Sequence, residues 1–140
     1  MKNYLFLVAG SAIVLSACVS AQAGEDKMSE KAAAELAKYE KTGETQTCLS
    51  TSRIRSIDPI DDRNFLVHMN NRDVYLNKVS GKCHGASRVG NRLQYTITAN
   101  QLCRNEIITV VDNSLNTTVG SCGLNSFEEL RELPEEPAEE

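Results

Sequence analysis

Four widely spaced cysteines constrain the fold of this chain more than any other feature. They are Cys48, Cys83, Cys103 and Cys122, and they are separated by 35, 20 and 19 positions. No two of them form a Cys-x-x-Cys pair, so a zinc ribbon, a thioredoxin-type redox site and a haem-attachment motif all lack their required spacing. An even set of cysteines within about 80 residues favours two disulfides in an exported protein.

The N-terminus predicts export. Lys2 is the only charged residue before a mostly apolar run over residues 4–15. This run is shorter than the roughly 20 residues that a membrane-spanning helix needs, and its layout is typical of a secretory signal peptide. The segment Leu15-Ser16-Ala17-Cys18 resembles the lipobox of bacterial lipoproteins. The resemblance implies that residues 1–17 are removed and that Cys18 is the lipid attachment site, carrying diacylglycerol and palmitate.

A second cleavage signal leaves an alternative open. Ala21-Gln22-Ala23 has the small-x-small form that ordinary signal peptidase reads, and cleavage after Ala23 would release a soluble periplasmic or secreted chain. We prefer the lipoprotein because of its motif. Val19 is not the Asp that retains many Gram-negative lipoproteins in the inner membrane, so the expected location is the outer membrane, facing the periplasm.

Charge divides the mature chain into three parts. Residues 18–47 are predicted to be a lipidated spacer that is part helical over residues 28–41. This helix is either solvated or docked onto the domain through Leu36 and Tyr39. Residues 48–127 hold nine Lys or Arg against six Asp or Glu and form the predicted domain. Residues 128–140 hold seven Glu and two Pro and are predicted to be an acidic disordered tail. The middle is only mildly basic, which argues against a nucleic-acid partner.

Residues 48–127 alternate as short strands separated by turn residues. Strand patterns cover residues 53–57, 65–69, 74–76, 92–98, 107–111 and 117–119. They predict an all-β fold, a compact antiparallel sheet in a small sandwich or partly open barrel, stapled by two disulfides. Four cysteines allow three connectivities. We prefer Cys83 with Cys103, because they bracket a strand, and Cys48 with Cys122, which would tie the ends together.

The same region resembles a known family. Cys48, the segment 74–78 running to Cys83, the Leu102-Cys103 pair before an Ile-rich strand, and Cys122-Gly123-Leu124 carry the resemblance. Together they are similar to a domain-of-unknown-function family of small exported bacterial proteins, many with lipoprotein signals. This resemblance implies an exported, disulfide-bonded domain over residues 48–127 and supplies no reaction or substrate.

Residue types that could carry catalysis lack the partners that it needs. His68 lies in the middle of a predicted strand, and His84 follows Cys83, which can bind a metal only if it is not oxidised. Ser114 and Ser121 lack a Gly-x-Ser-x-Gly motif. No catalytic residue, metal site or cofactor is predicted.

Charged residues in the domain allow one binding hypothesis. Asp58, Asp61 and Asp62 form an acidic cluster beside Pro59, which turn chemistry explains. Arg53 and Arg55 are two positions apart on a strand, so they point the same way and form a candidate anion-binding patch.

The predicted function is that of a cell-envelope lipoprotein, a tethered periplasmic binding or assembly-accessory module. Its predicted partners are the membrane, through the lipid anchor, and an envelope protein or an anionic envelope glycolipid. The alternatives are a small envelope enzyme or inhibitor, and a metal- or redox-handling protein that uses Cys and His.

Overall fold

The computed structural model describes residues 28–134. The predicted signal peptide, Cys18 and Ala23 lie outside the described residues, as does the end of the acidic tail. The described chain is mostly β. Its elements are α1 (Glu30–Leu36), β1 (Tyr39–Gln46), β2 (Cys48–Ser50), the 3-10 turn η1 (Thr51–Arg53), β3 (Ile54–Pro59), β4 (Asn64–Met69), β5 (Val74–Lys78), β6 (Asn91–Tyr95), β7 (Gln101–Cys103), β8 (Ile107–Asp112), β9 (Thr117–Gly123) and β10 (Phe127–Glu132).

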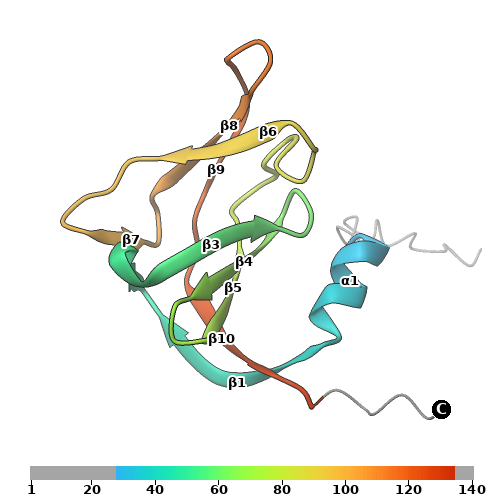
Figure 1. Ribbon diagram of the computed structural model, residues 1–140, viewed down its shortest axis with the longest axis vertical. Helices are drawn as coiled ribbons and strands as arrows, with labels where there is room; N and C mark the ends of the chain where they lie inside the picture. The colour runs from blue at the N-terminus through green and yellow to red at the C-terminus, as the bar shows by residue number, and fades with distance from the viewer. Residues whose placement is uncertain (1–27, 135–140) are drawn as a thin grey trace, which may run out of the picture.

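The strands form three antiparallel sheets. The largest has five strands in the order β1-β10-β5-β4-β3, a second has the order β6-β8-β9, and β2 pairs with β7. Figure 1 shows α1 beside the five-stranded sheet and the β8–β9 hairpin projecting at the upper end of the molecule. The all-β antiparallel prediction is confirmed, and the strands of residues 28–134 do not close into a barrel.

Both faces of the five-stranded sheet are covered. On one face, Phe65 and Val67 of β4 and Phe127 of β10 pack with Ile108 and Val110 of the three-stranded sheet. The opposite face, with Leu66, Leu76 and Leu130, packs against Ala32 of α1. Because successive strand residues point to opposite faces, this double cover buries five of the six residues of β4, and only His68 is part exposed.

The segment before Cys48 belongs to the fold, which corrects the predicted domain limits. Ser29 caps α1 by accepting a hydrogen bond from the Ala32 amide at 3.1 Å. Ala32 is fully buried, and Leu36 and Tyr39 pack against the same core. Residues 39–46 are a strand rather than a spacer, since β1 pairs along β10. The possible helix over 28–41 is therefore shorter than predicted and ends where β1 begins.

The predicted disordered tail also begins too early. Residues 128–132 lie in β10, between β1 and β5. Leu130 is buried under α1, so one apolar residue among glutamates is enough to fix the face of the strand. The predicted domain, residues 48–127, is therefore too short at both ends. Residues 39–46 and 128–132 also belong to it, because the backbone groups of β1 and β10 hydrogen-bond each other.

A buried asparagine stabilises the segment in which the chain passes from the three-stranded sheet to the five-stranded sheet. Asn77 is fully buried in β5, where its Nδ2 donates to the Asn125 carbonyl at 2.6 Å and its Oδ1 accepts from the Asn125 amide at 3.1 Å. These bonds fix the bend between β9, in the three-stranded sheet, and β10, in the five-stranded sheet. A buried polar side chain with two satisfied hydrogen bonds thus connects the two halves of the core.

Two disulfides are present, but the preferred pairing is wrong. The bonds are Cys48–Cys103 and Cys83–Cys122, not Cys83–Cys103 and Cys48–Cys122. Cys48 and Cys103 are directly opposed where β2 pairs with β7, with Cα atoms 4.0 Å apart. Cys83 lies in the loop after β5, beside β9, and its Cα is 5.1 Å from that of Cys122. Cys83 and Cys103 bracket β6 in the sequence, but this does not predict that they pair, because β6 pairs with β8 and not with the segments on either side of it.

Candidate functional site

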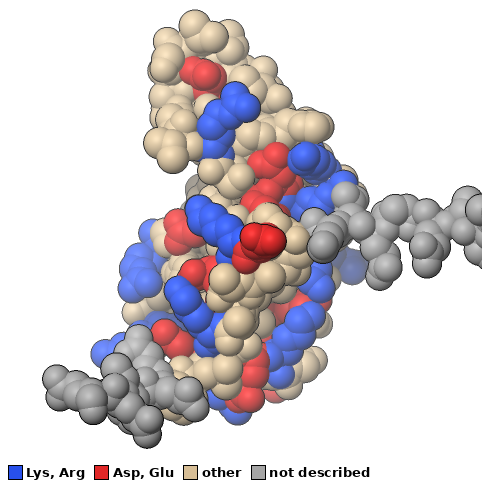
Figure 2. All heavy atoms as spheres, turned by 90° about the vertical axis from the view of Figure 1, so that its right-hand side faces the viewer, with Lys and Arg blue, Asp and Glu red and all other residues tan. Residues whose placement is uncertain are grey.

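The two arginines that the sequence predicts as an anion-binding patch lie on the exposed surface, away from the hollow described below. Arg53 ends η1, and Arg55 lies on β3, an edge strand of the five-stranded sheet; both are exposed. The pairing of β3 with β4 shifts register between Ile54 and Ser56, so Arg55 has no direct cross-strand partner. Neither arginine lines the hollow described below. On the face shown in Figure 2, Lys and Arg alternate with Asp and Glu, so no single sign of charge dominates it.

His68 forms a structural contact instead of a catalytic one. Its Nε2 lies 3.3 Å from Oδ2 of Asp58, and the Ser56 hydroxyl donates to the same Asp58 oxygen at 2.8 Å. The serine and the histidine therefore contact the acid and not each other, which is the wrong order for an activated nucleophile. This cluster links β3 to β4 at the sheet edge.

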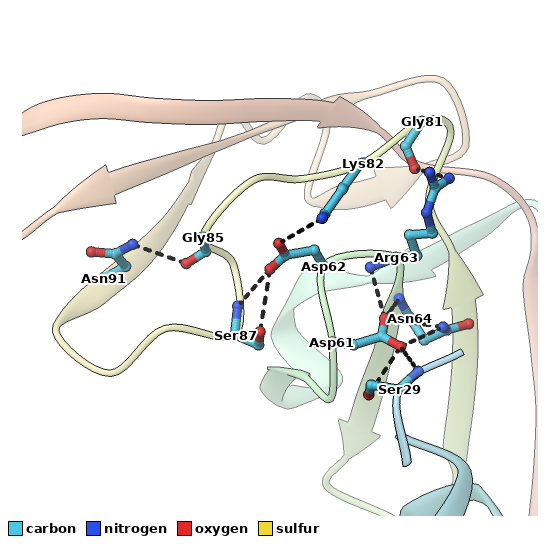
Figure 3. Close-up of polar contacts among 10 residues, drawn as sticks. All are labelled: Ser29, Asp61, Asp62, Arg63, Asn64, Gly81, Lys82, Gly85, Ser87 and Asn91. Carbon is cyan, nitrogen blue, oxygen red and sulfur yellow. Dashed lines mark hydrogen bonds and ion pairs between the residues drawn. The ribbon is translucent and has the colours of Figure 1, made fainter. Parts of the chain in front are cut away.

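Two loops meet at one end of the five-stranded sheet and enclose a hollow. The β3–β4 turn, residues 60–63, contacts the β5–β6 loop, residues 79–90, through two backbone hydrogen bonds. The Val79 amide donates to the Arg63 carbonyl at 2.9 Å, and the Cys83 amide donates to the Asp62 carbonyl at 2.8 Å. Figure 3 shows the polar side chains that converge here.

The hollow has two adjoining parts, of about 570 and 580 Å³. Both are lined by Asp62, Lys82 and Ser87. We call the whole the loop cleft. The first part is further lined by Met28, Ser29, Asp61, Arg63, Asn64, Lys78 and Val79, and the second by His84, Gly85, Arg88, Asn91 and Val119.

Asp61 organises the floor of the loop cleft. Its Oδ1 accepts from the amides of Arg63 at 2.8 Å and Asn64 at 2.7 Å, and the Asn64 side chain donates to both of its oxygens. The amide and hydroxyl of Ser29 lie 3.5 Å from Oδ2. Burial, the largest single influence, raises the pKa of the Asp61 carboxyl, but these donors together lower it below its ordinary value of 3.8. The carboxylate is thus occupied by turn chemistry.

Asp62 points the other way and holds the β5–β6 loop. Its Oδ1 accepts from the Ser87 hydroxyl at 3.2 Å and the Ser87 amide at 3.4 Å. Its Oδ2 lies 3.9 Å from the Lys82 ammonium (Figure 3). The acidic cluster of the sequence is therefore divided, since Asp58 contacts His68 whereas Asp61 and Asp62 each hold a different segment.

β9 fixes the far wall of the loop cleft. The Cys83–Cys122 disulfide ties the loop to β9, and Nδ2 of Asn91 donates to the Gly85 carbonyl at 2.9 Å. A side chain at Gly120 would place its Cβ 2.5 Å from the His84 carbonyl oxygen, so only glycine lets the loop approach this closely. The disulfide also occupies Cys83, which excludes a Cys83–His84 thiolate site while the bond is intact.

The loop cleft carries more positive than negative charge. Its cations are Arg63, Lys78, Lys82 and Arg88, against Asp61 and Asp62. Lys78 and Lys82 are half-exposed, and among residues 28–134 their ammonium groups lie 3.9 Å from the carboxylates of Glu128 and Asp62, respectively. These contacts leave donor positions of both ammonium groups open to a ligand. Strand alternation favours Arg53 and Arg55 in the sequence. Lys82 and Arg88 lie in a loop, which has no period that would group them with Lys78 at the end of β5.

Exposed apolar side chains flank the loop cleft. Val119 lines its second part with 44% of its surface exposed, and Val89, next to Arg88, is 98% exposed. Leu115, in the β8–β9 turn, is 73% exposed. The Asn113 amide donates to the Gly90 carbonyl at 3.0 Å, which brings this turn beside Val89. Most of the uppermost lobe in Figure 2 is neither acidic nor basic, although red and blue side chains also lie on it.

Comparison with known proteins places the chain in a family. Residues 1–132 match a family of unknown function, DUF6491. The chain belongs to DUF6491. No curated protein and no solved structure matches this DUF6491 chain. Its two disulfides indicate a protein that resides outside the cytoplasm. Within residues 28–134, no helix has the length and apolar character needed to cross a membrane.

Proposed function

We propose that this DUF6491 protein is a cell-envelope lipoprotein whose domain binds an anionic ligand in the loop cleft. The observation that carries the proposal is the imbalance of charge in the cleft. Lys78, Lys82 and Arg88 line it, while the Asp61 carboxylate is already hydrogen-bonded by backbone and side-chain donors. Half-exposed ammonium groups beside a hollow attract phosphate and carboxylate groups.

The donors of the cleft suit an oxyanion better than a metal cation. Lys78 and Lys82 contribute ammonium groups to the lining, and Ser87, whose hydroxyl donates to Asp62, lines both parts of the cleft. Both oxygens of Asp61 and Oδ1 of Asp62 accept hydrogen bonds, and Oδ2 of Asp62 lies 3.9 Å from the Lys82 ammonium. Within residues 28–134, no three His, Cys, Asp or Glu side chains are grouped for a metal ion.

The envelope location rests on the sequence and is consistent with the disulfides. Leu15-Ser16-Ala17-Cys18 supports lipidation at Cys18, and Val19 supports the outer membrane. A domain with two disulfides is suited to the periplasm, where the bonds persist. In this proposal the protein is a tethered binding or assembly-accessory module, and the cleft is its binding surface.

The cleft is tested by titrating the protein with inorganic pyrophosphate and following backbone amide shifts by NMR. We expect shifts at residues 61–64 and 78–91. The double variant Lys78→Ala/Lys82→Ala should weaken binding about tenfold, because two ammonium groups are lost. Arg53→Ala/Arg55→Ala removes the same charge elsewhere and should bind as the parent does. Shifts centred on Arg53 and Arg55, or no shifts, would overturn the cleft as the binding site.

The anchor is tested by the intact mass of protein purified from native membranes and alkylated without reductant. We expect a chain that begins at Cys18, carries a lipid-sized increment and has no alkylated thiol. An unlipidated chain that begins at Gly24 would overturn the lipoprotein assignment and leave a soluble envelope protein. Alkylation at Cys83 or Cys103 would instead contradict the two disulfides.

A further inference from the structure

The chain enters the fold at the loop cleft. Met28, the first described residue, lines the cleft, and the Ser29 amide and hydroxyl contact Asp61 on its floor. Nine residues, 19–27, lie between Cys18 and Met28, so ten Cα–Cα steps join the two positions. Fully extended at roughly 3.5 Å per residue, they span about 35 Å at most. If Cys18 is lipidated, Met28 and the cleft that it lines therefore stay within about 35 Å of the lipid attachment site.

Charge is distributed unequally between the two ends of the five-stranded sheet. β4 and β5 have Asn64 and Lys78 at the cleft end, and the turn that joins them lies at the other end. A separate hollow at that other end is lined by four carboxylates, those of Glu44, Asp73, Glu129 and Glu132, against two arginines. The cationic cleft and this acidic hollow thus lie at opposite ends of the same strands.

The apolar side chains beside the cleft complete an amphipathic surface. Val89 is almost fully exposed, and Leu115 is mostly exposed. The hydrogen bond from the Asn113 amide to the Gly90 carbonyl holds their two loops together. Figure 1 shows the β8–β9 turn, which carries Leu115, at the extreme upper end of the molecule, whereas β10 ends near the lower end. A surface that binds at a bilayer interface combines cationic side chains with exposed apolar side chains beside them.

We infer that the loop cleft binds the phosphate of anionic phospholipid headgroups in the anchoring membrane, while Val89 and Leu115 insert among the headgroups. This inference rests on the proposed function and names its ligand. Lys78, Lys82 and Arg88 supply the positive charge, and Met28, from which the chain leads back to Cys18, lines the same cleft. The acidic hollow is then directed away from the anionic surface.

The test uses the mature chain from residue 18 with Cys18→Ser, so that no lipid anchor contributes. Its sedimentation with vesicles of phosphatidylglycerol and phosphatidylcholine is compared with that on phosphatidylcholine alone. We expect binding only to the anionic vesicles. Lys78→Ala/Lys82→Ala should weaken it by about tenfold or more, since each basic residue near an anionic surface contributes substantially. Val89→Ser/Leu115→Ser should weaken it several-fold without changing pyrophosphate binding.

Two controls match these variants. Arg53→Ala/Arg55→Ala removes two charges outside the cleft, and Ile107→Ser removes an apolar side chain that is 59% exposed at the opposite end of β8 from Leu115. Both should bind vesicles as the parent does. Pyrophosphate binding without vesicle binding would overturn the membrane inference and leave the cleft as a site for a soluble anion. Vesicle binding that the cleft variant retains would also overturn it.

Discussion

At the scale of single residues, neighbouring side chains of one type have different tasks. Asp61 accepts hydrogen bonds from backbone amides two and three positions ahead and ties the β3–β4 turn to the start of α1. Asp62 reaches the opposite loop through Ser87. The sequence predicts turn chemistry for the acidic cluster, and the contacts of Asp61 confirm that interpretation. The contact of Asp62 across 25 positions is not predictable, because no local pattern specifies it.

Removing the Asp61 carboxylate should destabilise the protein more than removing that of Asp62. Asp61→Ala leaves two backbone amides and the Asn64 side chain without their acceptor, and we expect the free energy of unfolding to fall by about 2 kcal/mol. Asp62→Ala breaks longer contacts and should cost less than about 1 kcal/mol. Urea unfolding of both variants measures the difference. Equal losses would show that the turn does not depend on Asp61.

The lowered pKa of Asp61 also predicts how stability changes with pH. A carboxyl whose pKa is lower when folded than when unfolded adds stability above its unfolded pKa, and the gain is lost as pH falls through the folded pKa. The difference in unfolding free energy between the parent and Asp61→Ala should therefore be constant from pH 7 to about 5 and shrink below about pH 4. Urea titrations at a series of pH values test this, and a difference that grows in acid would contradict it.

At the scale of elements, strand alternation finds the core strands and misses the polar ones. The predicted strands at 65–69, 74–76 and 107–111 fall within or nearly coincide with β4, β5 and β8. β1 is missed because it has six exposed and two half-buried residues and so no apolar face, and β10 because glutamates surround Leu130. β2 and β7 have three residues each, too few for a period. Pairing partners, which sequence alone does not show, stabilise all four.

The approach of the β5–β6 loop to β9 depends on a glycine that the strand pattern does not reveal. Gly120→Ala would put Cβ 2.5 Å from the His84 carbonyl oxygen and force the loop away, so we expect a loss of about 2 kcal/mol and weaker pyrophosphate binding. Gly123→Ala, in the same strand, meets only ordinary contacts of 3.7 Å or more and serves as the control. Thermal unfolding and titration of both variants provide the measurement. A Gly120→Ala protein that matches the control would show that the loop shifts without cost.

At the scale of the whole molecule, composition and cysteine spacing predict the class of fold but not its connections. An even set of four cysteines predicts two bonds, and alternation predicts antiparallel sheets, both of which the structure has. The pairing depends on which strands lie side by side, and Cys48 meets Cys103 only because β2 and β7, 55 positions apart at their cysteines, are neighbours. The loop cleft is unpredictable for the same reason, since its walls come from the start of α1, two loops and β9.

The two disulfides should have similar effects on global stability and different effects on the cleft. They close loops with sequence separations of 39 and 55 residues, and the chain-entropy relation then gives each about 4 kcal/mol. Cys83→Ala/Cys122→Ala releases the loop that carries Lys82 and Arg88, so we expect pyrophosphate binding to be lost together with stability. Cys48→Ala/Cys103→Ala loosens β2 and β7, which contribute no residue to the cleft.

The second double variant is therefore the matched control for the first. At low temperature and without urea, where both variants remain folded, Cys48→Ala/Cys103→Ala should bind pyrophosphate as the parent does. Amide hydrogen exchange should show faster exchange at residues 79–90 in one variant and at 48–50 and 101–103 in the other. If both variants lose binding equally, the cleft depends on global stability and not on the local tie between the loop and β9. Retained binding in Cys83→Ala/Cys122→Ala would show that the hydrogen bonds of Asp62 and Asn91 hold the loop without the disulfide.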